Sequence, residues 1–381
     1  MRIRCLRGAL CLWFAAVLLV ADESRMLAVA GLPEDPSQID FTALPRVPSE
    51  EITVFAGVKD ESAYNNHAYL EFFGGQFFAM WSMHPTNGNY HGMHVLYATS
   101  ADGKTWSKPG RITPVPEGKR YVARGFWARD GRLLALASLD SGAPKKQPHW
   151  AAADLELMAF AWNPRLKAWA AAGRVYDDTI NNFPPVRLPG GDWMMARRDY
   201  QSRFSLMLGG VKAINHWRIG NVPNPEMRSF TEPDVIVRPD GMIAMHIRDG
   251  GGSRRLYRAV SKDGGQTWSA PVQTNFPDAT SKNFNLRLSN GIYVLISNSN
   301  PKGRVPLTIA TSRDAKLYER LLIVEDAPGA PRIAGHDKGR GYTYPHAIER
   351  NGFLYVSYAK HRDDIVIRRI RIDALAGERK R

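Results

Sequence analysis

The chain has 381 residues, a formal net charge of +14 and 44% hydrophobic residues, which is enough to build one large core. Its two cysteines, Cys5 and Cys11, fall within the first 30 residues, so a mature chain without that segment has no disulfide, thiolate metal site or cysteine nucleophile. The basic balance favours an anionic partner, but no lysine-rich tail or nucleic-acid module occurs, so we expect no nucleic-acid binding.

Residues 1–30 have the pattern of a secretory signal peptide. Three arginines precede an apolar run at 9–20, which is shorter than the ~20 residues that span a bilayer, so an uncleaved anchor is disfavoured. Small residues at 28–30 form a cleavage pattern, and cleavage after Ala21 is the alternative. We therefore predict a secreted or periplasmic protein that is free of the membrane after cleavage. Removal of four arginines and two acidic residues with the leader would leave a net charge of +12.

The chain beyond residue 50 repeats a unit of turns and strands every 50 to 61 residues. In each unit a short apolar strand leads to a turn glycine and then to a second strand rich in aromatic, β-branched or methionine residues. The turn glycines are Gly75, Gly131, Gly191, Gly241, Gly291 and Gly352. In the clearest unit, 231–268, an Asp-Gly pair joins two apolar runs, which is a strong hairpin signal. Each unit therefore predicts one antiparallel sheet of about four strands.

A second turn recurs after the third strand of most units. Residues 261–268 read Ser-Lys-Asp-Gly-Gly-Gln-Thr-Trp, and a shortened and an eroded copy stand at 100–106 and 312–318. In such a turn the aspartate accepts backbone hydrogen bonds, glycine takes a positive φ, and tryptophan fills the space between adjacent sheets. We interpret this turn as structural rather than catalytic.

Six such sheets cannot each bury both faces alone, and radial packing around a channel solves this problem. The predicted fold class is all-β, a six-bladed β-propeller of four-stranded antiparallel sheets. A C-terminal strand at 365–372 should pair with the segment around 52–55 to close the ring. Residues 31–50, with four prolines, are predicted as an extended lead-in, 51–376 as the propeller, and 377–381 as a charged tail. We expect a monomer.

Two columns of polar side chains emerge when each unit is counted from its turn glycine. The start of the first strand and the end of the second share one edge of a hairpin, opposite the glycine turn. About eight residues before the glycine stand His67, Arg124, Phe183, Glu232, Asn283 and Tyr344. Seven residues after it stand Ser82, Ser138, Arg198, Arg248, Asn298 and Ala359, with Lys360 next. Radial packing would gather these groups at one mouth of the ring, which indicates a functional site.

Structural interpretations compete with the functional one for several of these residues. An inert ion network would explain Arg198, Arg248 and Glu232, and ring packing would explain Tyr344. The H-x-x-H pair at 91–94 has no further ligand in view, so we expect no metal and no cofactor.

The segment 231–358 resembles the sialidase superfamily, and the repeat extends the likeness over most of 50–372. The order Glu-Pro, apolar strand, Pro-Asp-Gly, apolar strand and Arg is similar to a sialidase segment that brings a glutamate and a substrate-binding arginine. The resemblance therefore implies these two roles for Glu232 and Arg248.

Two further residues gain a role from the same resemblance. Asn-Pro-Lys-Gly-Arg before an apolar strand implies a carboxylate-binding arginine at Arg304. Tyr-Thr-Tyr at the start of the last unit implies a nucleophilic tyrosine at Tyr344. Clustered arginines bind the carboxylate of a sialic or uronic acid bidentately. A glutamate that takes the phenol proton makes the tyrosine oxygen a nucleophile for an oxocarbenium centre.

The first unit departs from the sialidase pattern. Where sialidases carry an arginine in Arg-Ile-Pro, this chain reads Tyr-Asn-Asn-His at 64–67, and 83–91 holds no acid/base aspartate. Asn-His followed by Phe-Phe-Gly-Gly resembles propeller rhamnosidases and rhamnosyl-glucuronate lyases, which implies an acid/base role for His67. In that reading Arg248, with Arg198 or Arg124, neutralises a uronate while a proton is removed beside its carboxylate.

The sequence thus predicts an exported enzyme, most similar to an exo-sialidase-like glycoside hydrolase, that cleaves a glycosidic bond at or beside an acidic sugar of an anionic glycan. The catalytic candidates are His67, Glu232 and Tyr344. The substrate-binding candidates are Arg124, Arg198, Arg248, Arg304, Asn283 and Lys360. Two alternatives stay open, which are a polysaccharide lyase that uses His67 as acid/base and a non-catalytic glycan-binding propeller.

Overall fold

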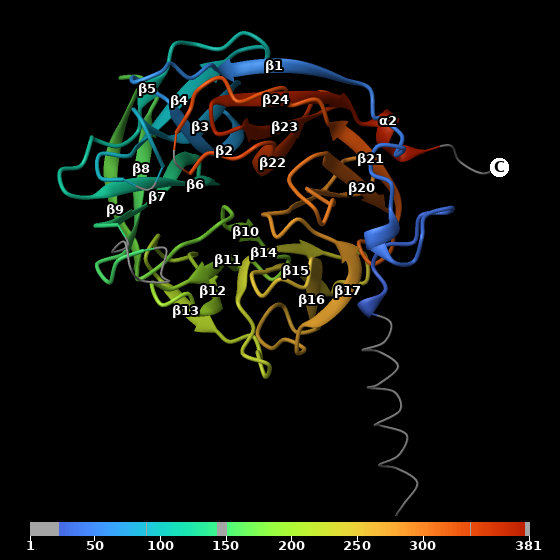
Figure 1. Cartoon of the computed structure of the whole chain (residues 1–381). Helices are drawn as coiled ribbons and strands as arrows, with labels where there is room; N and C mark the ends of the chain where they lie inside the picture. The colour runs from blue at the N-terminus through green and yellow to red at the C-terminus, as the bar shows by residue number, and fades with distance from the viewer. Residues whose placement is uncertain (1–22, 89, 143–150, 336, 378–381) are drawn as a thin grey trace, which may run out of the picture.

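The computed structural model describes residues 23–88, 90–142, 151–335 and 337–377 (Figure 1). Within these residues the strands form six four-stranded antiparallel sheets, which are arranged as blades around a ring (Figure 1). The predicted all-β, six-bladed propeller is therefore confirmed. A 3-10 helix, η1 (Pro36–Gln38), precedes the ring, and a short α-helix, α2 (Asp373–Ala376), follows its last strand.

The blades follow one another along the chain, with the innermost strand first in each. The first blade contains β2 (Tyr64–Phe73), β3 (Gln76–His84), β4 (His94–Ser100) and β5 (Gly110–Arg111). The second contains β6 (Arg120–Arg129), β7 (Arg132–Asp140), β8 (Glu156–Asn163) and β9 (Ala168–Asp177). The third contains β10 (Val186–Arg187), β11 (Trp193–Arg198), β12 (Phe204–Gly209) and β13 (Trp217–Gly220).

The remaining blades repeat this order, except that the last one borrows a strand from the N-terminal side of the ring. The fourth contains β14 (Phe230–Val237), β15 (Ile243–Asp249), β16 (Arg255–Ser261) and β17 (Val272–Pro277). The fifth contains β18 (Phe284–Arg287), β19 (Tyr293–Ser297), β20 (Leu307–Ser312) and β21 (Tyr318–Glu325). The sixth contains β22 (Tyr342–Arg350), β23 (Phe353–Lys360), β24 (Asp364–Arg371) and, outermost, β1 (Ser49–Phe55).

The ring closes through the pairing of β1 with β24. The two strands are antiparallel, with Ile52 opposite Ile367 and Thr53 opposite Val366. This is the closure predicted from the sequence, and it ties the first strand of the domain to its last one (Figure 1). Opening the ring at this point therefore requires the hydrogen bonds of a whole ladder to break together.

The core lies between neighbouring blades rather than in one central layer. Trp81 of the first blade packs with Ile52, Ile365 and Ile367 of the sixth in a single buried cluster. Each blade interface removes apolar faces of two sheets from water, at roughly 25 cal/mol per Å² of apolar surface. This interblade packing holds the inner strands at fixed angles around the channel.

The clearest copy of the repeated turn has the structural role that its sequence predicts. Asp263 accepts hydrogen bonds from the backbone N–H groups of Gln266 and Thr267, at 3.0 and 2.9 Å. Trp268 donates from its indole nitrogen to the Gly265 carbonyl at 3.0 Å, and its ring joins the cluster between the third and fourth blades. Gly265 has φ 87°, and a Cβ there would lie 2.1 Å from the Met194 side chain. The turn therefore fastens one blade to the next.

The predicted leader and tail fall partly outside the described residues. Positions 1–22 and 378–381 lie beyond them, whereas 23–30 lie against the fifth blade, where Leu27 forms a parallel bridge with Tyr318. The lead-in continues along the fourth and fifth blades until β1 begins (Figure 1). Among the described residues, no helix has both the length and the apolar character that a membrane crossing requires.

Candidate active site

The inner strands of four blades carry a β-bulge near their first residues. The register shifts lie between Asn66 and Tyr69, Ala123 and Gly125, Thr231 and Asp234, and Thr343 and His346. Three of these bulges contain a residue in the left-handed region, namely His67 (φ 58°), Glu232 (φ 48°) and Tyr344 (φ 55°). Side-chain-bearing residues adopt this region rarely, and such positions concentrate at functional sites. Each bulge turns one side chain toward the same mouth of the ring.

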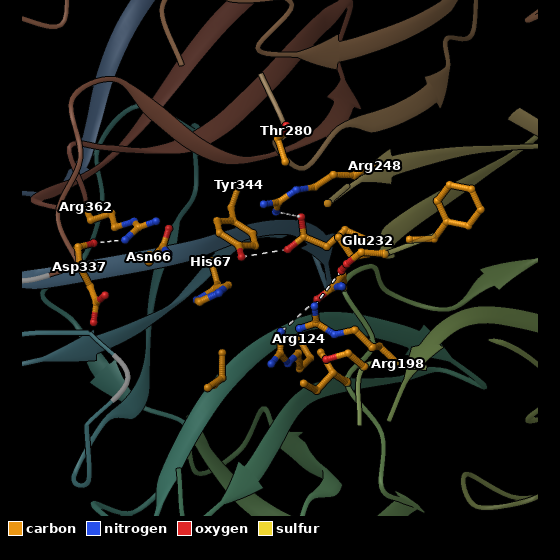
Figure 2. A pocket seen from close by; sticks show the side chains of 18 of the residues that line it. Asn66, His67, Arg124, Arg198, Glu232, Arg248, Thr280, Asp337, Tyr344 and Arg362 are labelled. Atoms are coloured by element: carbon orange, nitrogen blue, oxygen red, sulfur yellow. Dashed lines mark hydrogen bonds and ion pairs between the residues drawn. The ribbon is translucent and has the colours of Figure 1, made fainter. Parts of the chain in front are cut away.

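A cavity of about 600 Å³ occupies that mouth. Its lining includes seven of the nine residues predicted as catalytic or substrate-binding. These are His67, Arg124, Arg198, Glu232, Arg248, Arg304 and Tyr344. They come from all six blades, and Figure 2 shows His67, Tyr344, Glu232 and three of the arginines pointing toward one another.

Glu232 links Tyr344 to Arg248 at the centre of the cavity. The Tyr344 hydroxyl donates to Glu232 Oε1 at 2.9 Å, and Arg248 Nη1 donates to Glu232 Oε2 at 2.5 Å (Figure 2). Burial disfavours the Glu232 carboxylate, but the charges of Arg248 and Arg198 outweigh it and lower the pKa to about 2. Burial and the Glu232 charge raise the pKa of Tyr344 to about 12. At neutral pH the centre is thus a carboxylate that accepts a phenol hydrogen bond.

His67 lies against the other side of Tyr344. The two ring centroids are 4.2 Å apart and the planes are tilted by 56° (Figure 2). Its Nδ1 atom is buried and has no hydrogen-bond partner among the described residues. Burial, followed by the charges of Arg124 and Lys282, holds the pKa of His67 well below its usual range. The imidazole is therefore neutral at neutral pH and can accept a proton.

Four further guanidinium groups, those of Arg124, Arg198, Arg304 and Arg362, line the cavity without a carboxylate partner among the described residues. Arg124 donates to Ser138 Oγ at 2.8 Å and to Asn182 Oδ1 at 3.2 Å, and Arg198 donates to Thr231 Oγ1 at 2.8 Å. Burial lowers the pKa of Arg124 to about 10 and also lowers that of Arg304. Desolvated cations without a counter-charge favour an anionic ligand.

The structure does not bring Asn283 and Lys360 to this cavity. Asn283 lies below it, fully buried, where its Oδ1 accepts from Asn285 at 3.3 Å. Counting about eight residues back from the turn glycine does not find a cavity residue in the fifth blade, because β18 begins only at Phe284. There Thr280 (φ 55°), in the preceding loop, lines the cavity instead. Lys360 lies one residue beyond its column, and its Nζ is 3.8 Å from Glu51 Oε2 on outer strand β1.

Counting residues from the turn glycines did not identify several residues that lie in or under the cavity. Arg362 lines it from the β23–β24 turn and donates to the Asp337 carbonyl (Figure 2). Asn66 and Asn182 lie beside it because they neighbour the bulges of the inner strands. Lys282 is 2% exposed beneath Tyr344, with Nζ 5.7 Å from that ring centroid. A lysine two residues before an inner strand was the one signal that could have drawn attention to it.

The two histidines of the H-x-x-H pair each contact a backbone carbonyl oxygen. His91 Nε2 lies 2.7 Å from the Ser141 carbonyl, and His94 Nδ1 lies 2.9 Å from the Gly92 carbonyl. In the part of the chain that the structure describes, no group of three or more His, Cys, Asp or Glu side chains could hold a metal ion.

Comparison with known proteins places the chain among propellers. The family model described as "BNR repeat-like domain" matches residues 166–356, which is half of the chain. A protein of unknown function from Dyadobacter fermentans DSM 18053 is 18% identical, with a TM-score of 0.65. The match includes 86% of this chain and 100% of that protein. No curated protein matches the sequence.

Two further similar structures are named as sialidases. One, a sialidase, is 19% identical with a TM-score of 0.64. The match includes 92% of this chain and 35% of that protein. The other is a leech intramolecular trans-sialidase complexed with 2,7-anhydro-Neu5Ac, at 13% identity and a TM-score of 0.62, with 87% of this chain covering 71% of it. At these identities the likeness establishes the shared fold.

Proposed function

We propose that this chain, which belongs to the BNR repeat-like family within the sialidase superfamily of propellers, cleaves a glycosidic bond at or beside an acidic sugar. The observation that carries the proposal is the hydrogen bond from Tyr344 to Glu232, at 2.9 Å, in a cavity lined by guanidinium groups. We further propose that the protein is exported, acts as a monomer on an anionic glycan, and needs no cofactor.

Tyr344 is the proposed nucleophile and Glu232 its base. As the phenol oxygen bonds to the anomeric carbon, its proton passes to Glu232 and the glycosidic bond breaks toward the leaving oxygen. A neutral phenol suits this role because a sugar carboxylate beside the reacting carbon would repel an anionic nucleophile. Water then releases the sugar from Tyr344, and the configuration at the anomeric carbon is retained.

Arg248 couples the binding of substrate to the strength of the base. Arg248 pairs with Glu232, and its charge is the largest contribution that lowers the pKa of Glu232. A substrate carboxylate on Arg248 would share this charge and raise the pKa of Glu232, so that the carboxylate accepts the Tyr344 proton more readily. Arg198 and Arg304 supply further donors for the same anion.

His67 is the proposed acid/base, in the place of the aspartate that the sequence lacks. It is neutral at neutral pH because burial, and then the nearby charges of Arg124 and Lys282, lower its pKa. An anionic substrate compensates Arg124 and its neighbours, which raises the pKa of His67 and lets it hold the proton that the leaving oxygen needs.

The position of His67 also favours a second candidate, a lyase reaction. In that reaction His67 removes the proton beside a uronate carboxylate, Arg124 and Arg198 neutralise the resulting charge, and the glycosidic oxygen leaves. The product contains an unsaturated uronate that absorbs in the ultraviolet, whereas hydrolysis produces a reducing sugar without this absorbance.

A panel of anionic glycans, including sialylated and uronate-containing ones, tests the proposal through product analysis. Wild type should release an acidic sugar or cut beside one, and Tyr344→Phe should lose this activity. Binding without turnover across the panel would instead identify a glycan-binding module. An unsaturated product, lost in His67→Ala and kept in Tyr344→Phe, would identify the lyase.

A further inference from the structure

The first described residues of the chain are built into the propeller. Glu23 is 8% exposed, and its two oxygens accept from Arg238 Nη1 at 2.9 Å and Nη2 at 2.6 Å. Arg258 Nε lies 2.7 Å from the same carboxylate. Arg238 and Arg258 are 3% and 0% exposed, so Glu23 forms ion pairs with two buried guanidiniums of the fourth blade.

The next residues extend the outer edge of the fifth blade. The backbone N–H groups of Met26 and Leu27 both donate to Asn275 Oδ1 at 2.8 Å, and Asn275 Nδ2 donates to the Leu27 carbonyl at 2.8 Å. Tyr318 N donates to the Met26 carbonyl at 2.8 Å, and Ala28 N donates to the Tyr318 carbonyl at 2.9 Å. Met26 is fully buried. Residues 23–30 thus cover part of β21, which would otherwise be an exposed edge strand.

We propose that residues 23–30 are retained in the exported protein as a clamp on the fourth and fifth blades, and that signal cleavage occurs after Ala21. Cleavage after Ala30, the other small-residue pattern, would remove the carboxylate between Arg238 and Arg258 and uncover the start of β21 at Tyr318. Loss of one partner of a buried ion pair is strongly destabilising because the remaining charge stays desolvated. The mature chain therefore begins at Asp22.

N-terminal sequencing and intact mass of the wild-type protein recovered after export test this processing site. Asp22 as first residue is expected. A chain that begins at Gly31, or one that keeps residues 1–21, would overturn the proposal. As a second measurement, Glu23→Gln should lower Tm by roughly 5–10 °C, whereas the exposed Glu34→Gln should leave it unchanged. Equal Tm values for the two variants would show that residues 23–30 do not stabilise the fold through Glu23.

A second inference concerns Lys282 and rests on the proposed function. Its Nζ lies 4.3 Å from the Phe183 ring centroid, 4.4 Å from that of Tyr69 and 5.7 Å from that of Tyr344. It donates only a long hydrogen bond, 3.4 Å, to the Tyr69 hydroxyl. Among the described residues no carboxylate lies within ion-pair distance of it. The floor of the cavity is thus an amine held in an aromatic cage directly below the proposed nucleophile.

The charged and titratable groups around Lys282 come from four inner strands. They are Glu232 and Asp234 on β14, Arg124 on β6, His67 and Tyr69 on β2, and Tyr344 and His346 on β22. Burial, opposed by the Glu232 and Asp234 charges, lowers the pKa of Lys282 to about 7. Burial also raises the pKa of Asp234 to about 7, so this acid is a weak counter-charge.

We propose that Lys282 is a positioning residue whose ammonium form, beneath Tyr344, stabilises the negative charge that develops on the phenol oxygen as its proton leaves. The effect needs no contact with substrate, because a buried charge acts over several ångströms in a medium of low dielectric constant. When Lys282 loses its proton, this stabilisation disappears.

The pH dependence of turnover in Lys282→Met tests the role. In the wild-type protein kcat should fall as pH rises through about 7. In Lys282→Met, kcat at acidic pH should be roughly tenfold lower than in wild type and should not fall as pH rises through about 7, and KM should be unchanged. The exposed Lys262→Met, as matched control, should behave like wild type. An identical alkaline fall in Lys282→Met would overturn the inference. Absence of turnover in wild type would instead overturn the proposed function. The variant should fold, because it removes a costly buried charge.

Discussion

The ion pair at the centre of the cavity makes a prediction that needs no substrate. In Glu232→Gln the side chain keeps its shape and its hydrogen bond to Tyr344 but loses the charge that Arg248 and Arg198 stabilise. The pKa of Glu232 falls from an ordinary 4.5 to about 2, which corresponds to about 3 kcal/mol at 1.36 kcal/mol per pKa unit.

The sign of the pH dependence follows from the direction of this shift. A folded-state pKa below the unfolded value stabilises the protein above pH 4.5, and the contribution is lost as pH falls toward 2. Glu232→Gln should therefore be about 3 kcal/mol less stable than wild type at pH 7. The difference should shrink to about 1.4 kcal/mol at pH 3 by the same linkage relation.

Denaturant unfolding of both proteins at pH 7 and pH 3 measures this difference. Glu71→Gln is the matched control, because burial raises the pKa of Glu71, so that its negative charge does not stabilise the folded state. That variant should be as stable as wild type at pH 7, or more stable. A Glu232→Gln variant equal to wild type at pH 7, or a difference that does not shrink at pH 3, would refute the electrostatic account of the site.

The remaining predictions concern turnover and binding. Tyr344→Phe should reduce kcat by a factor of about 10³ or more with little change in Tm, because it removes only the nucleophilic oxygen, and pre-steady-state kinetics on a released chromophore would show the loss of a burst. His67→Gln should lower kcat by a factor of about 10²–10⁴ on substrates with poor leaving groups and much less on activated ones, as a leaving-group series would show. Arg304→Met should weaken acidic-sugar inhibitors roughly tenfold or more and leave neutral ones unaffected in calorimetry, whereas Arg313→Met, on the surface of the fifth blade, should bind both normally.

The fold was predictable because its signals are local and repeated. Glycine turns at regular spacing predict six hairpins, and the turn at 261–268 specifies how one blade meets the next. The ring closure was predictable because the last repeat ends after three strands, and the strand that begins near Ser49 precedes the first repeat and can supply the missing fourth one.

The site was predictable only where a blade keeps about eight or nine residues between the bulge residue and the turn glycine. That holds for His67, Glu232 and Tyr344, and it fails at Asn283, because the fifth blade begins its inner strand late and presents Thr280 instead. The left-handed backbone at these bulges has no sequence signature such as glycine, so their convergence is visible only in three dimensions.

Long-range contacts explain the rest of what sequence reasoning could not find. Residues 23–30 were assigned to the leader from local composition alone. The partners of Glu23 lie at Arg238 and Arg258, more than 200 residues further along the chain. Likewise, Lys282 gains its aromatic cage from three other blades.

The central claim is that Tyr344 attacks the anomeric carbon of an acidic sugar. The most direct measurement is peptide mapping by mass spectrometry after incubation with a fluorinated acidic-sugar substrate, whose glycosyl-enzyme forms faster than it is hydrolysed. The account predicts one added glycosyl group, on the peptide that contains Tyr344, and none in Tyr344→Phe or Glu232→Gln. An active wild-type enzyme that accumulates no adduct, or that carries the group on another residue, would contradict it.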